Sequence, residues 1–177
     1  MCVDRVQECA TLCENMQKLT FLCSVGISIS LLAPAQQLST KKTLNLPMAK
    51  QIAAASEKEA AKNGWMMYIT VVDDGANIVY LERFDDAQLG SFEVSIEKAK
   101  TAVLFRRPSK AFEDQVAAGR NGILKLPGAL PVEGGIPLMA DGKVIGAIGV
   151  SGGTSQQDAQ VAQAGVAALE AALKGTK

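Results

Sequence analysis

The sequence contains no histidine, and this absence removes several classes of site at once. Imidazole is the usual base beside a catalytic serine or cysteine, and a frequent ligand of zinc and of haem iron. Sites that depend on it are therefore excluded. An excess of charge is also lacking, because 18 Lys and Arg balance 18 Asp and Glu. The balance gives no electrostatic reason to expect a nucleic acid as partner.

Cysteine is confined to the first 23 residues, and aromatic residues make up only 5% of the chain. Cys9 and Cys13 lie four positions apart, but no second pair and no histidine accompany them, so no metal site is predicted. The remainder of the chain has no thiol. A disulfide framework and a cysteine nucleophile are thus unavailable to any domain that follows residue 23.

Residues 16–35 have the pattern of a secretory signal peptide. Lys18 precedes an apolar stretch over residues 19–32, and Ala33-Pro34-Ala35 provides a small-residue cleavage site. The alternative is a buried amino-terminal helix, which the serines and glycine of residues 24–30 disfavour. The stretch is shorter than the roughly 20 residues that span a bilayer, so no stable membrane anchor is predicted. We expect an exported protein, periplasmic or secreted.

Residues 1–15 lie ahead of this signal, and a start codon assigned upstream of Met16 would explain them. Residues 36–45 are polar and are predicted to form a flexible lead-in. Residues 46–177 are then one folded domain, a length that can bury a sizeable core.

The first half of this domain is predicted to contain a helix, a hairpin and two more helices. Asn45 is a typical helix cap, and Asn63-Gly64 is a typical helix end. Residues 65–72 and 78–84 have strand composition and flank a turn. Further helices are predicted over residues 92–105, from a cap at Ser91, and over about ten residues from Ser109.

The second half is organised around a glycine-rich hairpin. Residues 133–140 and 144–150 are predicted strands, and Asp141-Gly142 is a dipeptide that favours a two-residue turn. Glycines inside the second strand predict that another element packs closely against it. Ser155 is predicted to cap a final helix, with Asp158 three residues later as in a capping box. Together these elements predict an α+β fold, an antiparallel sheet with helices packed on it.

Few residues with catalytic chemistry are grouped in the sequence. Ser151 lies in a glycine-rich loop but has no histidine to activate it, and the loop lacks the Gly-Lys-Ser/Thr of a phosphate-binding loop. Arg106-Arg107 before a proline is either an anion site or an exposed pair. Asp85 and Glu133 could exchange protons with a substrate only if folding brings them together. The apolar, breaker-rich residues 121–132 could cover a pocket or a subunit interface.

An ordered set of motifs resembles the GlcG/HbpS family of haem-binding-protein-like domains, also found at the carboxyl end of some cobalamin adenosyltransferases. No single motif is diagnostic, but the set covers about residues 46–174 in order. Its members are Asp73-Asp74-Gly75, Arg83-Phe84-Asp85-Asp86-Ala87, Glu97-Lys98-Ala99-Lys100-Thr101-Ala102, Gly134-Gly135-Ile136-Pro137-Leu138, Gly146-Ala147-Ile148-Gly149-Val150-Ser151-Gly152-Gly153 and Asp158.

The resemblance implies a profilin-like fold with about five antiparallel strands between helices, and assembly into homo-oligomers. The fifth strand would come from residues 124–126 or 130–132. For some members the resemblance implies haem binding at a subunit interface, and the lack of histidine puts that ligation in doubt for this chain. The remaining ligands would be Met66, Met67, Met139 or a hydroxyl such as that of Thr101.

Two functions follow from the residues and the resemblance together. The first is a non-enzymatic protein that binds haem or another small molecule. The second is a cofactor-free enzyme acting on small carboxylate or carbonyl metabolites, with Arg83 or Lys98 binding a carboxylate and Asp85 or Glu133 moving a proton. No catalytic residue is assigned. The predicted ligand-binding residues are Arg83, Asp85, Lys98, Thr101, Gly134 and Gly135.

Overall fold

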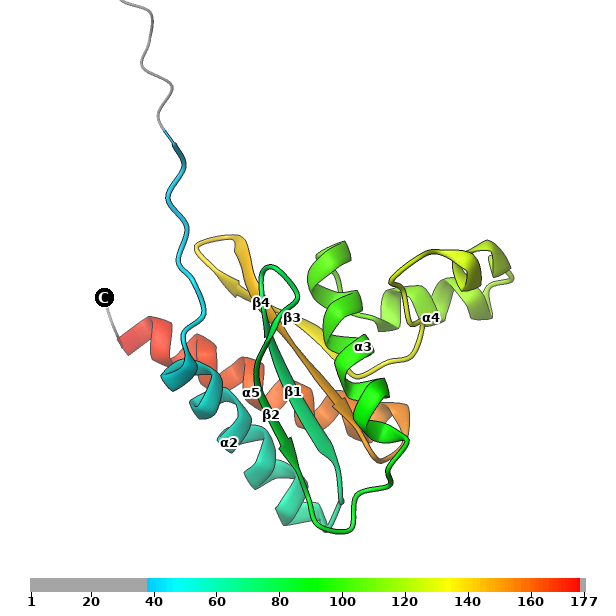
Figure 1. Cartoon of the computed structure of the whole chain (residues 1–177), viewed down its shortest axis with the longest axis horizontal. Coiled ribbons are helices and arrows are strands. Elements are labelled where there is room, and N and C mark those ends of the chain that lie inside the picture. Colours follow the sequence, from blue (N-terminus) through cyan, green and yellow to red (C-terminus); the bar gives the residue numbers. More distant parts are fainter. Residues whose placement is uncertain (1–37, 176–177) are drawn as a thin grey trace, which may run out of the picture. The chain divides into compact units, whose positions relative to one another are not determined.

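The computed structural model describes residues 38–175, and the chain from Thr40 onward forms one compact unit. The predicted start-site extension and signal peptide lie outside the described residues. Within these described residues, four α-helices, one 3₁₀ helix and four strands follow in the order shown in Figure 1. They are α2 (Leu46–Asn63), β1 (Tyr68–Asp73), β2 (Ile78–Arg83), α3 (Ser91–Phe105), α4 (Lys110–Ala117), η1 (Asn121–Lys125), β3 (Gly135–Ala140), β4 (Lys143–Ser151) and α5 (Ser155–Gly175). The α+β prediction is confirmed.

The four strands form one antiparallel sheet in the order β2-β1-β4-β3. Both predicted hairpins are present, and Asp141 and Gly142 have φ angles of 50° and 72°, as a two-residue turn requires. The expected fifth strand is wrong within the described residues. Residues 121–125 form η1, and residues 130–132 join no strand. Pro127 and Pro131 lack the N–H that a strand ladder needs, which explains the irregular course of this segment.

Helices cover both faces of the sheet (Figure 1). Helix α3 packs on one face, where Ala99 and Ala102 meet Val72 and Ala147. Helices α2 and α5 pack together on the other face. The Ser56 hydroxyl of α2 donates to the Val161 carbonyl of α5 at 2.8 Å. The larger core cluster is on this second face, because two helices there exclude water from side chains of β1, β3 and β4.

Helix ends explain how the sequence places these elements. The Asn45 carboxamide accepts from the Met48 N–H at 3.0 Å, so the predicted cap of α2 is confirmed. Helix α5 differs from the prediction, because Thr154 and Gln157 form the reciprocal capping box instead of Ser155 and Asp158. Because the cap lies one residue earlier than predicted, Asp158 takes no part in the capping box and its side chain faces the interior.

The predicted cap at Ser91 is also wrong. Helix α3 begins at Ser91 itself, and its hydroxyl accepts from the Gln88 carboxamide instead of capping the helix. Among the described residues, no helix combines the length and the apolar character needed to cross a membrane.

Candidate functional site

A buried ion pair joins the middle of α3 to the first turn of α5. The Lys98 ammonium lies 2.6 Å from the Asp158 carboxylate, and their side chains are only 1% and 3% exposed. Lys98 also donates to the Val150 carbonyl of β4 at 3.1 Å, and Asp158 accepts from the Gly153 N–H at 3.0 Å. These contacts fix the start of α5 against the end of β4. Both charges are paired and hydrogen bonded, which is the condition for burying them.

Opposing effects act on the pKa of Asp158. Burial of the carboxyl raises it, and this effect is the larger one. The Lys98 ammonium and the backbone N–H groups of Gly152 and Gly153 stabilise the ionised form and oppose the rise. The net pKa lies above the ordinary value of 3.8. The Lys98–Asp158 pair is buried away from solvent, and its role is to hold α3 and α5 together.

Gly134 and Gly135 pass directly over this ion pair. A Cβ atom at Gly134 would lie 2.9 Å from the Lys98 ammonium nitrogen, and one at Gly135 would lie 2.1 Å from the Lys98 carbonyl oxygen. No side chain larger than hydrogen fits there, since real Cβ contacts under 3.0 Å essentially never occur. The two glycines let β3 begin in contact with α3. The predicted close packing against the second strand of the hairpin is confirmed at Gly149, where a Cβ atom would lie 2.1 Å from the Ser95 carbonyl oxygen of α3.

Ser109 fixes the start of α4 to the same glycines. Its hydroxyl accepts from the Gly135 N–H at 2.9 Å, and its own N–H donates to the Gly135 carbonyl at 2.9 Å. Because Ser109 is fully buried, these bonds are shielded from water. Helix α4 is thereby held beside the first residues of β3.

A cavity of about 590 Å³ opens where α4, β3 and α5 meet. Its volume falls within the roughly 300–1,000 Å³ of small-molecule sites. Helix α4 contributes Lys110, Ala111 and Asp114, and Gly134 to Ile136 form part of the lining at the start of β3. Helix α5 contributes Gln156, Ala159, Gln160 and Gln163. We call this space the α4–α5 cavity.

Some polar groups of the α4–α5 cavity have hydrogen-bond partners and one does not. Lys110 donates to Asp114 at 2.9 Å, and its ammonium lies 3.6 Å from the Glu133 carboxylate. The hydrogen bond to Asp114 and the nearby Glu133 charge raise the pKa of Lys110. The Glu133 backbone N–H donates to the Glu113 carboxylate at 2.6 Å. One Glu133 oxygen, Oε2, is buried without a hydrogen-bond partner among the described residues.

The structure separates the sequence-predicted site residues into three places. Gly134 and Gly135 line the α4–α5 cavity, and Lys98 lies directly behind them with its charge paired. Thr101 is buried further along α3, where its hydroxyl accepts from the Leu130 N–H at 2.8 Å and donates to the Glu97 carbonyl. Thr101 thus anchors the segment that precedes the cavity.

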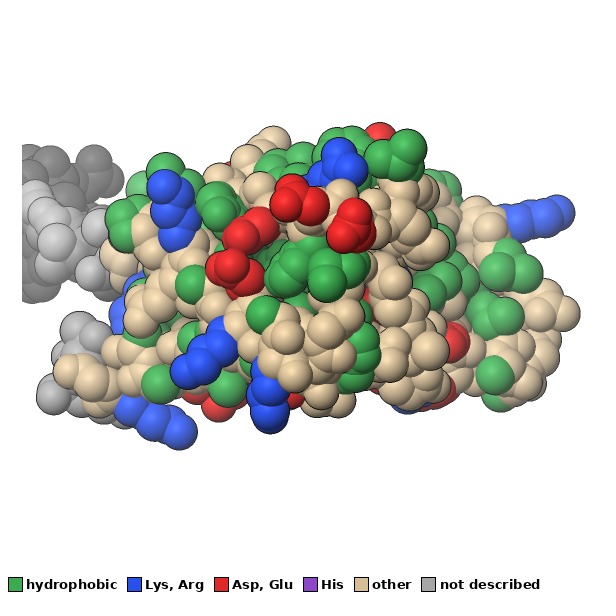
Figure 2. All heavy atoms as spheres, turned by 90° about the horizontal axis from the view of Figure 1, so that it is seen from below, with side chains coloured by type: hydrophobic (Ala, Val, Ile, Leu, Met, Phe, Trp, Pro, Cys, Tyr) green, Lys and Arg blue, Asp and Glu red, His purple; other side chains and the backbone are tan. Residues whose placement is uncertain are grey.

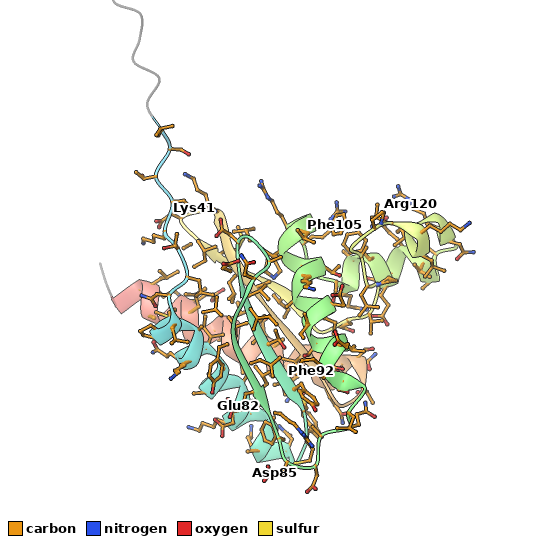
Figure 3. All side chains as sticks on the ribbon, in the orientation of Figure 1. Lys41, Glu82, Asp85, Phe92, Phe105 and Arg120 are labelled. Atoms are coloured by element: carbon orange, nitrogen blue, oxygen red, sulfur yellow. The ribbon has the colours of Figure 1, made fainter. Side chains whose placement is uncertain are left out.

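Arg83 and Asp85 lie at the far edge of the sheet. Two strands separate β2 from β3, which corresponds to about 14 Å between the edge strands. Arg83 stacks over the Tyr68 ring and donates to the Asp85 carbonyl. Figure 3 places Asp85 at the lower end of the fold, and Figure 2, viewed from below, shows acidic side chains there around hydrophobic ones. Arg83 and Asp85 do not line the α4–α5 cavity.

Helices α4 and α5 contribute cavity residues that were not predicted from the sequence. Lys110 and Asp114 are an ordinary i, i+4 pair on a short helix, a pattern typical of any exposed helix. The glutamines of α5 recur every three or four residues on a polar face. Nothing in either pattern distinguishes a cavity wall from a solvated helix. Within residues 38–175, no group of three or more Asp, Glu, Cys or His side chains is arranged to hold a metal ion.

The described residues form an α+β domain with a small-molecule-sized cavity at one edge of its sheet. The model of the family described as "Haem degrading protein HbpS-like" matches residues 44–167. Protein GlcG of Escherichia coli is 46% identical over 114 residues, which are 64% of this chain and 85% of GlcG. The chain belongs to the HbpS-like family.

Solved structures agree with this assignment. A double mutant of Streptomyces reticuli HbpS has a TM-score of 0.68 and 32% identity, covering 76% of this chain and 92% of that one. A structure of a PduOC–haem complex has a TM-score of 0.66 and 29% identity, covering 72% of this chain and 95% of that one. The resemblance to the GlcG/HbpS family is thus confirmed, and the family is haem-binding-like in character.

Proposed function

We propose that this chain is a small-molecule-binding protein and that its ligand occupies the α4–α5 cavity. The observation that carries the proposal is the buried Glu133 Oε2, which accepts no hydrogen bond among the described residues although the Lys110 ammonium lies 3.6 Å away, in a cavity of about 590 Å³. A buried carboxylate oxygen without a donor is unfavourable, because it has lost its water without gaining a hydrogen bond. A ligand that brings an N–H or O–H group to Glu133 removes this cost.

The lining favours a neutral or cationic ligand. Asp114 and Glu133 are opposed by Lys110 alone among the charged residues of the cavity wall. The remaining polar groups are the glutamine amides of α5, which can both donate and accept. Ala111, Ala159 and Ile136 provide apolar contact for the ligand body. A hydroxylated or amine-bearing small molecule matches this combination.

A pair of size-matched variants tests the proposal. Ala159→Phe fills the cavity from α5, whereas Ala167→Phe adds the same ring to the exposed side of that helix. Wild-type protein isolated from its native host should carry an additional mass in native mass spectrometry. Ala159→Phe should lose that mass and Ala167→Phe should keep it. Wild-type protein without bound mass, or Ala159→Phe that retains it, would contradict the proposal.

Haem is the first named ligand to test, because the PduOC neighbour is a haem complex. The α4–α5 cavity does not fit iron ligation, however, since no imidazole, thiolate, thioether or phenol lines it. A second copy of the chain cannot supply histidine either, because the sequence has none. Titration with haemin decides the matter. We expect Ala159→Phe and wild type to give the same Soret spectrum, and a saturable shift lost in Ala159→Phe would place haem in the cavity.

Catalysis is the second function that a specific observation favours. Glu133 is a partly buried carboxylate whose Oε2 accepts no hydrogen bond among the described residues, with the Lys110 ammonium 3.6 Å away, so it could accept a proton from a bound metabolite. The alternative is therefore a cofactor-free enzyme acting on small carbonyl or carboxylate compounds. Glu133→Gln keeps the shape of the side chain but removes the base. An enzyme of this kind would lose turnover in Glu133→Gln while retaining binding, and equal turnover would exclude Glu133 as the base.

We further propose that the mature protein is exported, periplasmic or secreted, and begins at Gln36. Support comes from the signal-peptide pattern of residues 16–35. The intact mass and amino-terminal sequence of protein from the native host test this proposal. A chain that retains residues 16–35 and stays in the cytoplasm would contradict it.

We also propose a homo-oligomer in which the β2 edge contributes to the interface. Ile78 of the edge strand β2 is 49% exposed, and Leu89 and Phe92, which follow β2 in the chain, are 74% and 39% exposed. Light scattering should give a mass above that of one chain for the wild type. Ile78→Glu should lower that mass, whereas Leu124→Glu, which changes an exposed residue of η1, should not. A monomeric wild type would overturn this proposal.

A further inference from the structure

A second cavity lies at the other end of β3, beside the β3–β4 turn. Its volume is about 440 Å³, and its Met139 is three positions of β3 beyond Ile136 of the α4–α5 cavity, roughly 10 Å along the strand. We call it the basic cavity, because three of its side chains are cationic. It is lined by Lys41, Arg106, Met139, Gly142, Lys143 and Val144.

Cations outnumber carboxylates in and around the basic cavity. Lys41 pairs with Asp74 of the β1–β2 turn, and Lys42 next to it pairs with Asp141. Lys143 donates to the Thr40 carbonyl at 2.8 Å, and no carboxylate within residues 38–175 pairs with its charge. An uncompensated cluster of this kind attracts anions.

Arg106 carries the strongest sign of a ligand at this position. It follows directly on α3 and has a φ of 54°, the left-handed conformation that favours glycine at a helix end. Its guanidinium makes no hydrogen bond or ion pair within residues 38–175. The carboxyl terminus of α3 attracts its positive charge only in a general way. Arg106 is exposed at this helix end, so its guanidinium is available to an anion that enters the basic cavity.

An apolar surface lies beside these charges. Met139 and Val144 are directly opposite each other in the β3–β4 ladder, so their side chains share one face of the sheet. Val144 packs next to the α3 cluster, and Met139 is 41% exposed. Figure 3 shows Lys41 and Phe105, the residue before Arg106, at the same upper end of the fold. The basic cavity therefore combines cationic groups with an apolar platform.

We propose that the basic cavity binds an organic anion, with its oxyanion on Arg106 and Lys143 and its apolar body on Met139 and Val144. A guanidinium recognises carboxylate and phosphate oxygens through two parallel N–H groups, and this fixes the orientation of the ligand. The site is independent of the α4–α5 cavity, so either proposal can fail without the other.

Four small probes separate the parts of this proposal. Benzoate and phenyl phosphate carry an oxyanion on the same ring, benzamide lacks the charge, and acetate lacks the ring. Titrations followed by ¹⁵N–¹H NMR should show saturable shifts at residues 106, 143 and 144. Benzoate or phenyl phosphate should bind at least about tenfold more tightly than benzamide and acetate, as a charge-assisted contact implies. The tighter of the two identifies the preferred oxyanion.

Two variants of Arg106 complete the test. Arg106→Gln should weaken binding by about tenfold or more, while Lys58→Gln, which removes an exposed charge from α2, should not. Arg106→Gly suits the left-handed backbone, so it should keep or raise the melting temperature and still lose binding. Equal affinity for benzoate and benzamide, equal affinity for benzoate and acetate, scattered shifts, or full binding by Arg106→Gly would each overturn the proposal.

Discussion

Lys98 and Asp158 are 60 residues apart in the chain, yet their charged groups lie 2.6 Å apart in the interior. Neither side chain reaches solvent to any useful extent, so each charge depends on the other for its compensation. The pair joins α3 to α5 immediately behind the glycines of the α4–α5 cavity. Its loss would therefore alter both the stability of the fold and the support of the cavity.

Removing one partner of this pair should be more harmful than removing both charges. Lys98→Met leaves a buried carboxylate uncompensated and should lower the free energy of unfolding by about 3–5 kcal/mol. Asp158→Asn retains an acceptor for the Gly153 N–H, so the double variant Lys98→Met with Asp158→Asn should be more stable than Lys98→Met alone. Urea unfolding of the single and double variants measures this. A double variant no more stable than Lys98→Met would contradict the assignment of the cost to an unpaired charge.

Gly135 should tolerate no side chain. Gly135→Ala brings a Cβ atom to 2.1 Å from the Lys98 carbonyl oxygen, so β3 must move away from α3. We expect a loss of at least about 3 kcal/mol in the free energy of unfolding. Gly90→Ala is the control, because Gly90 has a φ of −62° and open space around its Cβ position. That variant should be neutral or stabilised by up to about 1 kcal/mol. Similar losses in both variants would mean that the close packing is not as described.

Asp73 should make the first hairpin sensitive to acid. Burial raises the pKa of its carboxyl, but hydrogen bonds from Asn77 and Gly75 outweigh that effect and the net pKa is lowered. A carboxyl whose folded pKa is below its ordinary value of 3.8 stabilises the fold above that pH. This contribution is lost as the pH falls through the folded pKa.

The variants Asp73→Asn and Asp73→Ala test this pH dependence. Asp73→Asn keeps an acceptor for the two backbone N–H groups, both 2.9 Å away, but loses the charge. Its stability deficit relative to wild type should shrink as the pH is lowered below 3.8. Asp73→Ala should cost about 1–2 kcal/mol more, because the turn amides lose their acceptor. A deficit in Asp73→Asn that is constant with pH would be evidence against the hydrogen-bonded carboxylate.

Thr101 should control the order of the segment ahead of the α4–α5 cavity. Its hydroxyl accepts from the Leu130 N–H at 2.8 Å, so Thr101→Val leaves that amide without a partner. We expect a loss of about 1–3 kcal/mol and faster hydrogen exchange at Leu130. Thr101→Ser keeps the hydroxyl and should retain the protection. Unchanged exchange in Thr101→Val would show that the bond does not hold this segment.

Local elements could be predicted from the sequence because their signals are local. Asn45, Gly64 and the Asp141-Gly142 turn each determine a helix end or a turn through residues a few positions away. The cap of α5 was displaced by one residue because Thr154 and Ser155 are both good capping residues. The side chain of Asp158 points inward to pair with Lys98, and this pairing is what distinguishes a cap at Thr154 from a cap at Ser155.

The candidate site could not be predicted in the same way, because it is formed by contacts between residues far apart in the sequence. Lys98 was predicted to face a pocket with Thr101, but its ammonium is paired with Asp158 on a different helix. Arg83 and Asp85 were predicted ligand-binding residues together with Gly134, and the order of strands puts them at the opposite edge of the sheet from it. The expected fifth strand failed for a physical reason visible in the chain, since Pro127 and Pro131 interrupt any ladder.

The first and last described turns of the compact unit lie beside each other. Lys42 and Leu44, ahead of α2, line a small cavity together with Leu169 and Leu173 near the end of α5. Closely spaced chain ends make a domain suitable for circular permutation. A short linker from Gly175 to Thr40, with new ends opened at the exposed Gly119, would keep every sheet contact. In such a permuted protein the strands and helices would be synthesised in a different order, and both cavities would still form.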